Sequence, residues 1–267
     1  MQKTEIHSSA ILEPGAKIGS GCYVGPFSYI GPDVSIGDNC RVESHVVIVG
    51  NTTIGKGCHI FPFASLGHRP QDLKFKGEAS QLIIGDNNMI REYVTMNPGT
   101  EGGGLKTTVG HNCLFMASTH VAHDCVVGDS VIMANNATLA GHVSVGDFAI
   151  IGGLSGVLQR VRIGSHAMIG GMSAVESDVI PYGSTIGDRA FLSGLNIIGL
   201  KRRNFSRDDI HTLRSAYRLL FSPEGTLSER VDDVISRFKD NELVMEIIDF
   251  IRSDTSRPLC QPSEISA

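Results

Sequence analysis

An aliphatic residue returns at every sixth position along most of this chain, and that repeat limits the possible folds more than any other feature. The repeated positions run from Ile6 to Leu66, and after a gap from Ile84 to Met96 and from Val109 to Val175. A small residue follows four positions after most of them. An α-helix cannot keep every sixth residue on one face, because it has about 3.6 residues per turn. The repeat therefore predicts a triangular solenoid in which three six-residue units form one coil and successive coils stack at strand spacing.

Two further features of the repeat follow from this geometry. Gly often comes directly after the aliphatic residue, and we expect it to supply the positive φ needed near the corners. Cys22, Cys40, Cys58, Cys113 and Cys125 all occupy the small inward position. We predict that these thiols are buried as small packing groups rather than used in metal or disulfide chemistry.

The hexapeptide pattern resembles the left-handed parallel β-helix of the hexapeptide-repeat acyltransferases, and the handedness follows from that resemblance. We predict an all-β solenoid over residues 1–190, with loop insertions near 67–83 and 97–108. A small C-terminal α-helical domain is expected over residues 191–267. Its first long helix should begin after Ser206, which forms a capping box with Asp209. Such a domain would cover the open end of the solenoid.

Composition and charge argue against several classes of function. The net charge of −5 argues against a general nucleic-acid-binding domain. No apolar run of about 18 residues occurs, so no transmembrane segment is expected. The N-terminal residues lack the apolar stretch of a secretory signal, which favours a cytoplasmic location.

Three histidines, His120, His123 and His142, fall outside the inward positions and could lie together. His142 follows His123 by one coil plus one residue, so the two can be neighbours on adjacent coils. Three interpretations remain open from spacing alone. The histidines could form a polar face without chemistry, a three-histidine zinc site, or a general base that titrates near neutral pH.

Three segments resemble the UDP-N-acetylglucosamine O-acyltransferase family of lipid A biosynthesis. They are STHVAHDCVVGDSVIMANNATLAGHVSVGDFAIIGG, QDLKFKGE and NIIGLKRRNFSRDDI. The resemblance covers nearly the whole chain. It implies transfer of a 3-hydroxyacyl group from acyl carrier protein to the 3-hydroxyl of the GlcNAc moiety of UDP-GlcNAc. It also implies a homotrimer with active sites between subunits, no metal, and no cofactor beyond the phosphopantetheine of the carrier protein.

The resemblance also assigns roles to individual residues. His123 matches the catalytic base and Asp124 the acidic residue that supports it. Met168 and Gly171 match the acyl-chain groove, where Gly171 leaves room for a long chain. We add the backbone N–H of Gly141 as a donor to the oxyanion, because Gly permits close approach. The positions that match substrate-binding residues are Asp72, Lys74, His120, His142, Gln159, Asn196, Arg202 and Arg203.

Leu158, Ile198 and the pair Asn97-Pro98 depart from the family pattern, where many relatives have His, Glu and a His-Arg pair. These departures leave open whether the acceptor is UDP-GlcNAc or its 3-amino analogue, which would give an amide. Another hexapeptide-repeat acyltransferase, such as the later N-acyltransferase of the same pathway, is a further alternative. A zinc carbonic anhydrase on the same β-helix and a noncatalytic scaffold complete the set.

Overall fold

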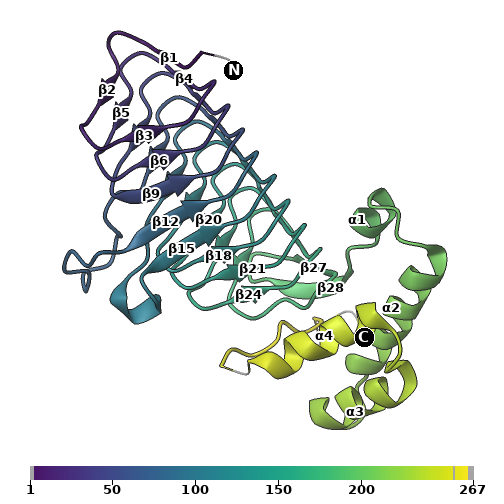
Figure 1. The fold of residues 1–267 in the computed structure, drawn as a ribbon. Coiled ribbons are helices and arrows are strands. Elements are labelled where there is room, and N and C mark those ends of the chain that lie inside the picture. The colour runs from purple at the N-terminus through teal and green to yellow at the C-terminus, as the bar shows by residue number, and fades with distance from the viewer. Residues whose placement is uncertain (1–2, 255, 264–267) are drawn as a thin grey trace.

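The computed structural model describes residues 3–254 and 256–263 of the 267-residue chain. Short strands wind into a triangular solenoid, and helices follow at its C-terminal end (Figure 1). Each strand pairs in parallel with the equivalent strand of the next coil, as between Ile30 and Ile48. The prediction of a left-handed parallel β-helix with a C-terminal helical domain is confirmed.

The strands form three sheets, one on each face of the solenoid. Sheet A contains β1 (Glu5–Ile6), β4 (Tyr23–Val24), β7 (Arg41–Val42), β10 (His59–Ile60), β13 (Met89–Ile90), β16 (Leu114–Phe115), β19 (Ile132–Met133), β22 (Ile150–Ile151), β25 (Met168–Ile169), β27 (Gly183–Ile186) and β28 (Phe191–Leu195). Sheet B contains β2 (Ile11–Leu12), β5 (Tyr29–Ile30), β8 (Val47–Ile48), β11 (Ser65–Leu66), β14 (Thr95–Met96), β17 (His120–Val121), β20 (Thr138–Leu139), β23 (Gly156–Val157) and β26 (Ala174–Val175). Sheet C contains β3 (Lys17–Ile18), β6 (Ser35–Ile36), β9 (Asn51–Ile54), β12 (Gln81–Ile84), β15 (Lys106–Val109), β18 (Val126–Val127), β21 (Ser144–Val145) and β24 (Arg162–Ile163).

The repeated aliphatic side chains fill the interior of the solenoid. Ile30, Ile48, Leu66 and Met96 stack in one column beneath sheet B and have no exposed surface. Burying a side chain of this size contributes about 1.5–3 kcal/mol. Because every coil repeats this contribution, the core continues from coil to coil along the axis.

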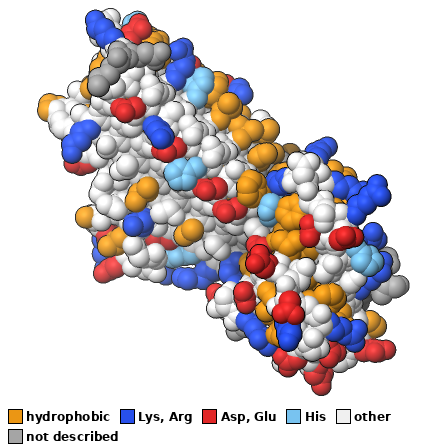
Figure 2. All heavy atoms as spheres, turned by 45° about the vertical axis from the view of Figure 1, so that its right-hand side comes forward, with side chains coloured by type: hydrophobic (Ala, Val, Ile, Leu, Met, Phe, Trp, Pro, Cys, Tyr) orange, Lys and Arg blue, Asp and Glu red, His pale blue; other side chains and the backbone are white. Residues whose placement is uncertain are grey.

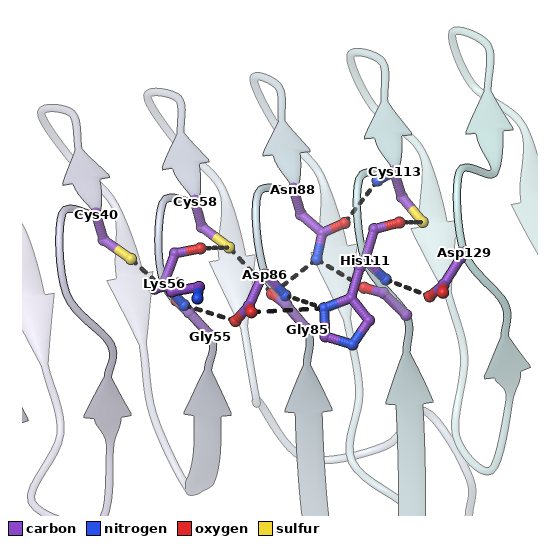
Figure 3. Close-up of polar contacts among 11 residues, drawn as sticks. Cys40, Gly55, Lys56, Cys58, Gly85, Asp86, Asn88, His111, Cys113 and Asp129 are labelled. Atoms are coloured by element: carbon purple, nitrogen blue, oxygen red, sulfur yellow. Dashed lines mark hydrogen bonds and ion pairs between the residues drawn. The ribbon is translucent and has the colours of Figure 1, made fainter.

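The inward cysteines are buried, as predicted, and each also makes a directed contact. The thiols of Cys40 and Cys58 point to the backbone carbonyls of Gly55 and Gly85 on the next coil, at 3.0 and 3.2 Å (Figure 3). Asn88 occupies the next position of this column and bonds the same kind of carbonyl with its side-chain amide. Burial raises the pKa of the Cys113 thiol to about 11, which keeps it protonated at neutral pH. Packing and a weak hydrogen bond therefore account for these thiols.

The repeated glycines have a different role from the one expected. None of them has a positive φ; that conformation occurs two residues later, as at Asn39, where φ is 57°. Gly37 is required for space instead: a Cβ there would lie 2.8 Å from the backbone of Gly55 and Lys56 in the next coil. The prediction that these glycines supply the positive φ was therefore wrong, and close stacking of coils is the physical reason for them.

Two segments leave the solenoid between strands. Residues 67–80 connect β11 to β12, and residues 97–105 connect β14 to β15 and contain a 3₁₀ turn, Glu101–Gly103. Residues 81–83 and 106–108 belong to β12 and β15, so they lie within sheet C.

Four helices follow the last strand: α1 (Ile197–Arg202), α2 (Arg207–Leu220), α3 (Leu227–Phe238) and α4 (Glu242–Ser253). Ser206 and Asp209 form the predicted capping box at the start of α2. The guanidinium of Arg162, on β24, donates to the backbone carbonyl of Phe250 at 2.9 Å and so ties α4 to the last coils. The predicted domain boundary at 190/191 falls between β27 and β28. Over residues 3–254 and 256–263, no helix has the length and apolar character needed to cross a membrane.

We predict that Gly37→Ala destabilises the protein by about 1–3 kcal/mol, because the new methyl group must displace the backbone of the next coil. Thermal unfolding checks this, since each kcal/mol corresponds to a fall of roughly 2–4 °C in a domain of this size. Gly156→Ala is the matched control, because a Cβ at Gly156 meets no atom within 4 Å. Equal losses in the two variants would contradict a steric role for Gly37.

Candidate active site

The three corners of the solenoid carry different groups of predicted site residues. Corner I, between sheets B and C, comprises residues 122–125, 140–143 and 158–161. Corner II, between sheets C and A, comprises residues 146–149 and 164–167. Corner III, between sheets A and B, comprises residues 152–155 and 170–173.

A histidine and a carboxylate form a hydrogen-bonded pair at corner I. Nδ1 of His123 lies 2.8 Å from Oδ2 of Asp124, and the Asp124 side chain has no exposed surface. Because an ionised carboxylate only accepts hydrogen bonds, Nδ1 carries the proton in this contact. Nε2 of His123 is then the atom that can accept a proton from a substrate.

Stacking between coils sets the orientation of His123. Gly141 lies one coil above it, and a Cβ on Gly141 would come within 2.5 Å of the His123 ring. Gly141 is therefore required for the imidazole to lie flat over the backbone. Among the residues that the structure describes, no acceptor takes the backbone N–H of Gly141. That N–H is a free donor beside the candidate base.

The loop 97–105 holds the carboxylate of the pair. Thr100 donates its backbone N–H to Oδ1 of Asp124 at 2.8 Å and its hydroxyl to Oδ2 at 2.6 Å. The backbone N–H of Asp124 in turn donates to the hydroxyl of Thr107 at 2.8 Å. Gly103 packs so closely that a Cβ there would lie 2.0 Å from the Asp124 carboxyl carbon. One Gly-rich loop thus fixes the group that orients His123.

The other two histidines of the predicted cluster are neighbours of His123. The rings of His123 and His142 meet edge to face with centroids 5.1 Å apart, as their spacing predicts. Burial lowers the pKa of His142, and the nearby Asp124 carboxylate opposes this effect. Burial also lowers the pKa of His120, with a smaller contribution from the charge of His123. Both imidazoles are therefore neutral near pH 7 and can donate or accept hydrogen bonds.

A cleft of about 450 Å³ opens beside the pair, between the two loops and corner I. Asp72 and Lys74 line it from the loop 67–80, and His142 and Gln159 line it from the solenoid. The Asp72 carboxylate accepts the backbone N–H of Lys74 at 2.9 Å, which shapes the loop tip. The structure thus places four predicted substrate-binding residues around one cleft next to His123.

The remaining predicted residues lie elsewhere in this chain. Asn196 caps helix α1 and donates to the backbone carbonyl of His166 at corner II, and Arg203 donates to that of Phe148 at the same corner. Arg202 ends the same helix and is exposed. Met168 lies on β25 of sheet A, and Gly171 lies at corner III. One chain therefore does not bring these residues to the cleft at corner I.

The donor atoms of His123, Asp124 and His142 lie within 4.8 Å of one another, a grouping that could hold a metal ion. Two ligand atoms of one tetrahedral zinc ion lie about 3.3 Å apart, given bonds of about 2.0–2.1 Å. The distance of 2.8 Å between Nδ1 of His123 and Oδ2 of Asp124 is shorter and is that of a hydrogen bond. This geometry favours a protonated Nδ1 over a zinc ligand.

The positions that depart from the family pattern have different environments. Asn97 is buried, and its amide donates to the carbonyl of His68 at 2.9 Å, which braces the start of the loop 67–80. Leu158 and Ile198 are exposed apolar side chains. Asn97 is therefore a structural element of this chain, whereas the other two are free to meet a ligand.

Sequence reasoning missed Thr100, Thr107, Gly103 and Arg160, which surround the pair or the cleft. The two threonines meet Asp124 across 24 and 17 residues of chain, distances unrelated to the six-residue period. The one available signal was the Gly-rich composition of the second insertion.

Two family models match the chain. A model described as Udp N-acetylglucosamine O-acyltransferase, Domain 2, matches residues 178–260. A model described as bacterial transferase hexapeptide (six repeats) matches residues 15–50 and 106–141. The first match contains the helical domain, and the second lies within the solenoid.

Curated relatives match along nearly the whole chain. The chain is 59% identical over 257 residues to the acyl-[acyl-carrier-protein]–UDP-N-acetylglucosamine O-acyltransferase of Caulobacter vibrioides, covering 96% of this chain and 98% of the relative. It is 48% identical over 260 residues to the enzyme of the same name from Rickettsia canadensis, covering 97% and 98%.

Solved structures agree with these matches. A crystal structure of a UDP-N-acetylglucosamine acyltransferase superposes with a TM-score of 0.94 at 44% identity, over 97% of this chain and all of the other. The UDP-N-acetylglucosamine acyltransferase of Francisella novicida gives a TM-score of 0.94 at 36% identity, over 98% of this chain and 95% of the other.

We predict that Thr100→Val lowers the turnover number roughly 10–100-fold, the equivalent of one hydrogen bond to a charged group. The variant keeps the shape and the backbone donor of Thr100 but removes the hydroxyl that holds Oδ2 of Asp124. Steady-state kinetics with the acyl donor and acceptor check this. Thr100→Ser restores the hydroxyl and should recover most of the rate; failure to recover would show that the hydroxyl is not the important group.

Proposed function

The chain belongs to the UDP-N-acetylglucosamine O-acyltransferase family, and we propose that its His123–Asp124 pair acts as the general base of the family reaction. The enzyme transfers a 3-hydroxyacyl chain from acyl carrier protein to the 3-hydroxyl of the GlcNAc moiety of UDP-GlcNAc, the first step of lipid A biosynthesis. The observation that most supports the role of the pair is the 2.8 Å contact between Nδ1 of His123 and a buried carboxylate.

The chemistry needs one base and one oxyanion donor. A sugar hydroxyl is a poor nucleophile at neutral pH, so Nε2 of His123 takes its proton while the oxygen attacks the thioester carbonyl. The buried Asp124 carboxylate stabilises the imidazolium that forms. The free N–H of Gly141 donates to the oxyanion of the tetrahedral intermediate. When the C–S bond breaks, the imidazolium returns the proton to the departing thiolate of the phosphopantetheine arm.

The acceptor sugar enters the cleft at corner I in this proposal. Asp72 and Lys74 bind it from the loop side, and Gln159 from the solenoid side. His120 and His142 are neutral near pH 7, so they hydrogen-bond the sugar or the acyl group without adding charge. A 3-amino acceptor fits the same base, because its attack also requires the loss of one proton.

We assign the other end of the acceptor to the region around helix α1. The guanidinium groups of Arg202 and Arg203 offer planar pairs of donors suited to a diphosphate, and Asn196 lies beside them. Met168 and Gly171 contribute to the acyl-chain groove. The reaction requires neither a metal nor a bound cofactor, because the carrier protein brings the acyl group on its own phosphopantetheine.

The separation of these residues supports a homotrimer with active sites between subunits. About six residues at a rise of ~3.3 Å separate neighbouring corners, so corners I, II and III lie roughly 15–20 Å apart. Residues of one corner therefore meet those of another only when two copies lie side by side. Corner III also carries exposed apolar side chains, among them Phe63, Tyr93 and Met172. Hydrophobic side chains gather along an edge of the solenoid on the face in Figure 2, as expected of a surface that another copy covers.

The substrates favour a cytoplasmic site of action. Acyl carrier protein and nucleotide sugars are soluble intracellular metabolites of fatty-acid and envelope synthesis. An enzyme that joins them works where both are made.

We predict that the purified enzyme transfers acyl groups from a panel of 3-hydroxyacyl carrier proteins to UDP-GlcNAc in the presence of a chelator. His123→Ala should lose activity by about 10²–10⁴-fold, the usual contribution of a positioned general base. The measurement is product formation by mass spectrometry, with the preferred donor reporting the length of the acyl groove. Activity that survives His123→Ala would exclude this base.

Loss of activity on chelation would instead favour a zinc role for the cluster. No transfer to UDP-GlcNAc, with transfer to the 3-amino analogue, would identify the acceptor as the amine.

Subunit complementation tests the shared site. His123→Ala and Arg203→Ala remove residues from corners I and II, so each variant alone is expected to be impaired. In mixed trimers formed from equal amounts, about a quarter of the sites combine an intact His123 with an intact Arg203 of a neighbouring subunit. We predict partial recovery of activity in the mixture; no recovery would place both residues in one subunit's own site.

A further inference from the structure

A carboxylate of the helical domain contacts the last coil of the solenoid at corner II. Glu246, on α4, accepts a hydrogen bond from the phenol of Tyr182 with one carboxylate oxygen and from the hydroxyl of Ser165 with the other. Tyr182 is the largest of the fully buried side chains. Burial raises the pKa of its phenol, and the contact with Glu246 acts in the same direction, so Tyr182 is protonated and acts as the donor.

Tyr182 is the end of a stack of rings. Its ring lies parallel to that of His166, with centroids 5.5 Å apart, and His166 lies parallel to Phe148 at 4.8 Å. Phe205 closes the stack from the side, with its ring edge-on to His166 at 5.2 Å. The stack therefore runs from the Glu246 contact to the corner on which Arg203 rests.

Arg203 lies at the other end of this stack. Its Nη2 donates to the backbone carbonyl of Phe148 at 2.7 Å, and its guanidinium carbon lies 5.4 Å from the centre of the Phe148 ring. Its Nη1 is buried and has no hydrogen-bond partner among the residues that the structure describes. A guanidinium nitrogen held in this way is a donor without an acceptor, and a phosphate oxygen is the kind of acceptor that suits it.

A second connection joins the same elements through the backbone. The backbone N–H of Tyr182 donates to the carbonyl of Ser165, and that of Asn196 donates to the carbonyl of Tyr182 at 2.7 Å. The side chain of Asn196 donates to the carbonyl of His166 and accepts the N–H of Gly199 in helix α1. The position of Tyr182 thus sets both the stack beneath Arg203 and the start of the helix that leads to it.

On the basis of the proposed nucleotide role of Arg203, we propose that Glu246 and Tyr182 are positioning residues for acceptor binding. They hold the ring stack and helix α1 so that Nη1 of Arg203 is presented to the diphosphate of a nucleotide sugar. Neither residue touches the reacting atoms, so they affect the affinity for the acceptor and not the chemical step. The C-terminal helical domain thereby contributes to acceptor recognition through the solenoid.

The test compares variants that remove or keep the contact. Glu246→Ala removes both hydrogen bonds, and Tyr182→Phe removes one and keeps the ring. Glu246→Gln keeps the shape, because its amide can accept from Tyr182 and donate to Ser165. Asp249→Ala, an exposed position on the same helix, is the matched control. The measurements are the KM for UDP-GlcNAc, the KM for the acyl carrier protein, kcat at saturation, and the binding of UDP by calorimetry.

We expect Glu246→Ala and Tyr182→Phe to weaken UDP binding and raise the KM for UDP-GlcNAc roughly 2–10-fold, the equivalent of a neutral hydrogen bond. The kcat at saturation and the KM for the carrier protein should stay near those of the parent enzyme, and Glu246→Gln should resemble the parent. In an Arg203→Ala background, Glu246→Ala should weaken UDP binding little further, because both act through the same group.

Lower thermal stability with unchanged UDP binding would overturn the proposal and leave Glu246 as a structural contact. If Glu246→Ala does not fold, Tyr182→Phe decides the question alone. Arg203→Ala separates the two levels of the argument. If it weakens UDP binding while Glu246→Ala and Tyr182→Phe do not, only the positioning role fails. If Arg203→Ala leaves UDP binding unchanged, the nucleotide role of Arg203 fails as well.

Discussion

The close stacking of each coil on the next is the constraint on which the rest of the structure depends. Parallel strand pairs fix the spacing of the coils, and any atom added at Gly37 would meet the backbone of the coil above. The same spacing places Gly141 against the ring of His123. Because a side chain at one position always lies over the equivalent position of the next coil, the scaffold and the catalytic geometry follow from one rule. The site inherits its rigidity from the stack.

Much of the fold could be predicted because a six-residue period fits only a few backbone arrangements. The inward residues, the buried cysteines and the capping box at Ser206 all followed from local pattern. The meeting of His123 with His142 could also be predicted, since one coil plus one residue separates them. The role of the repeated glycines could not, because the pattern shows where Gly occurs and not whether conformation or space requires it.

The contacts made by the insertions could not be derived from the repeat. Thr100 holds Asp124 across 24 residues, and nothing in the period relates the two positions. The resemblance identified His123, Asp124 and the cleft residues by matching short segments, but it gave no information on what orients them. Glu246 illustrates the same limit: it meets Tyr182 across 64 residues, and only the folded helical domain brings the two together.

A triangular prism has flat faces and convex edges, so it cannot form a concave site from its own repeats. Concavity has to be added, and this chain adds it with the loops 67–80 and 97–105, which build the cleft over corner I. The helical domain adds a second surface at corner II, where Arg203 rests on the ring stack. These two surfaces lie on different edges of one prism, and a long substrate such as a nucleotide sugar reaches both only when copies lie side by side. Assembly is then part of building the site, and the flat, rigid faces of the solenoid suit that assembly.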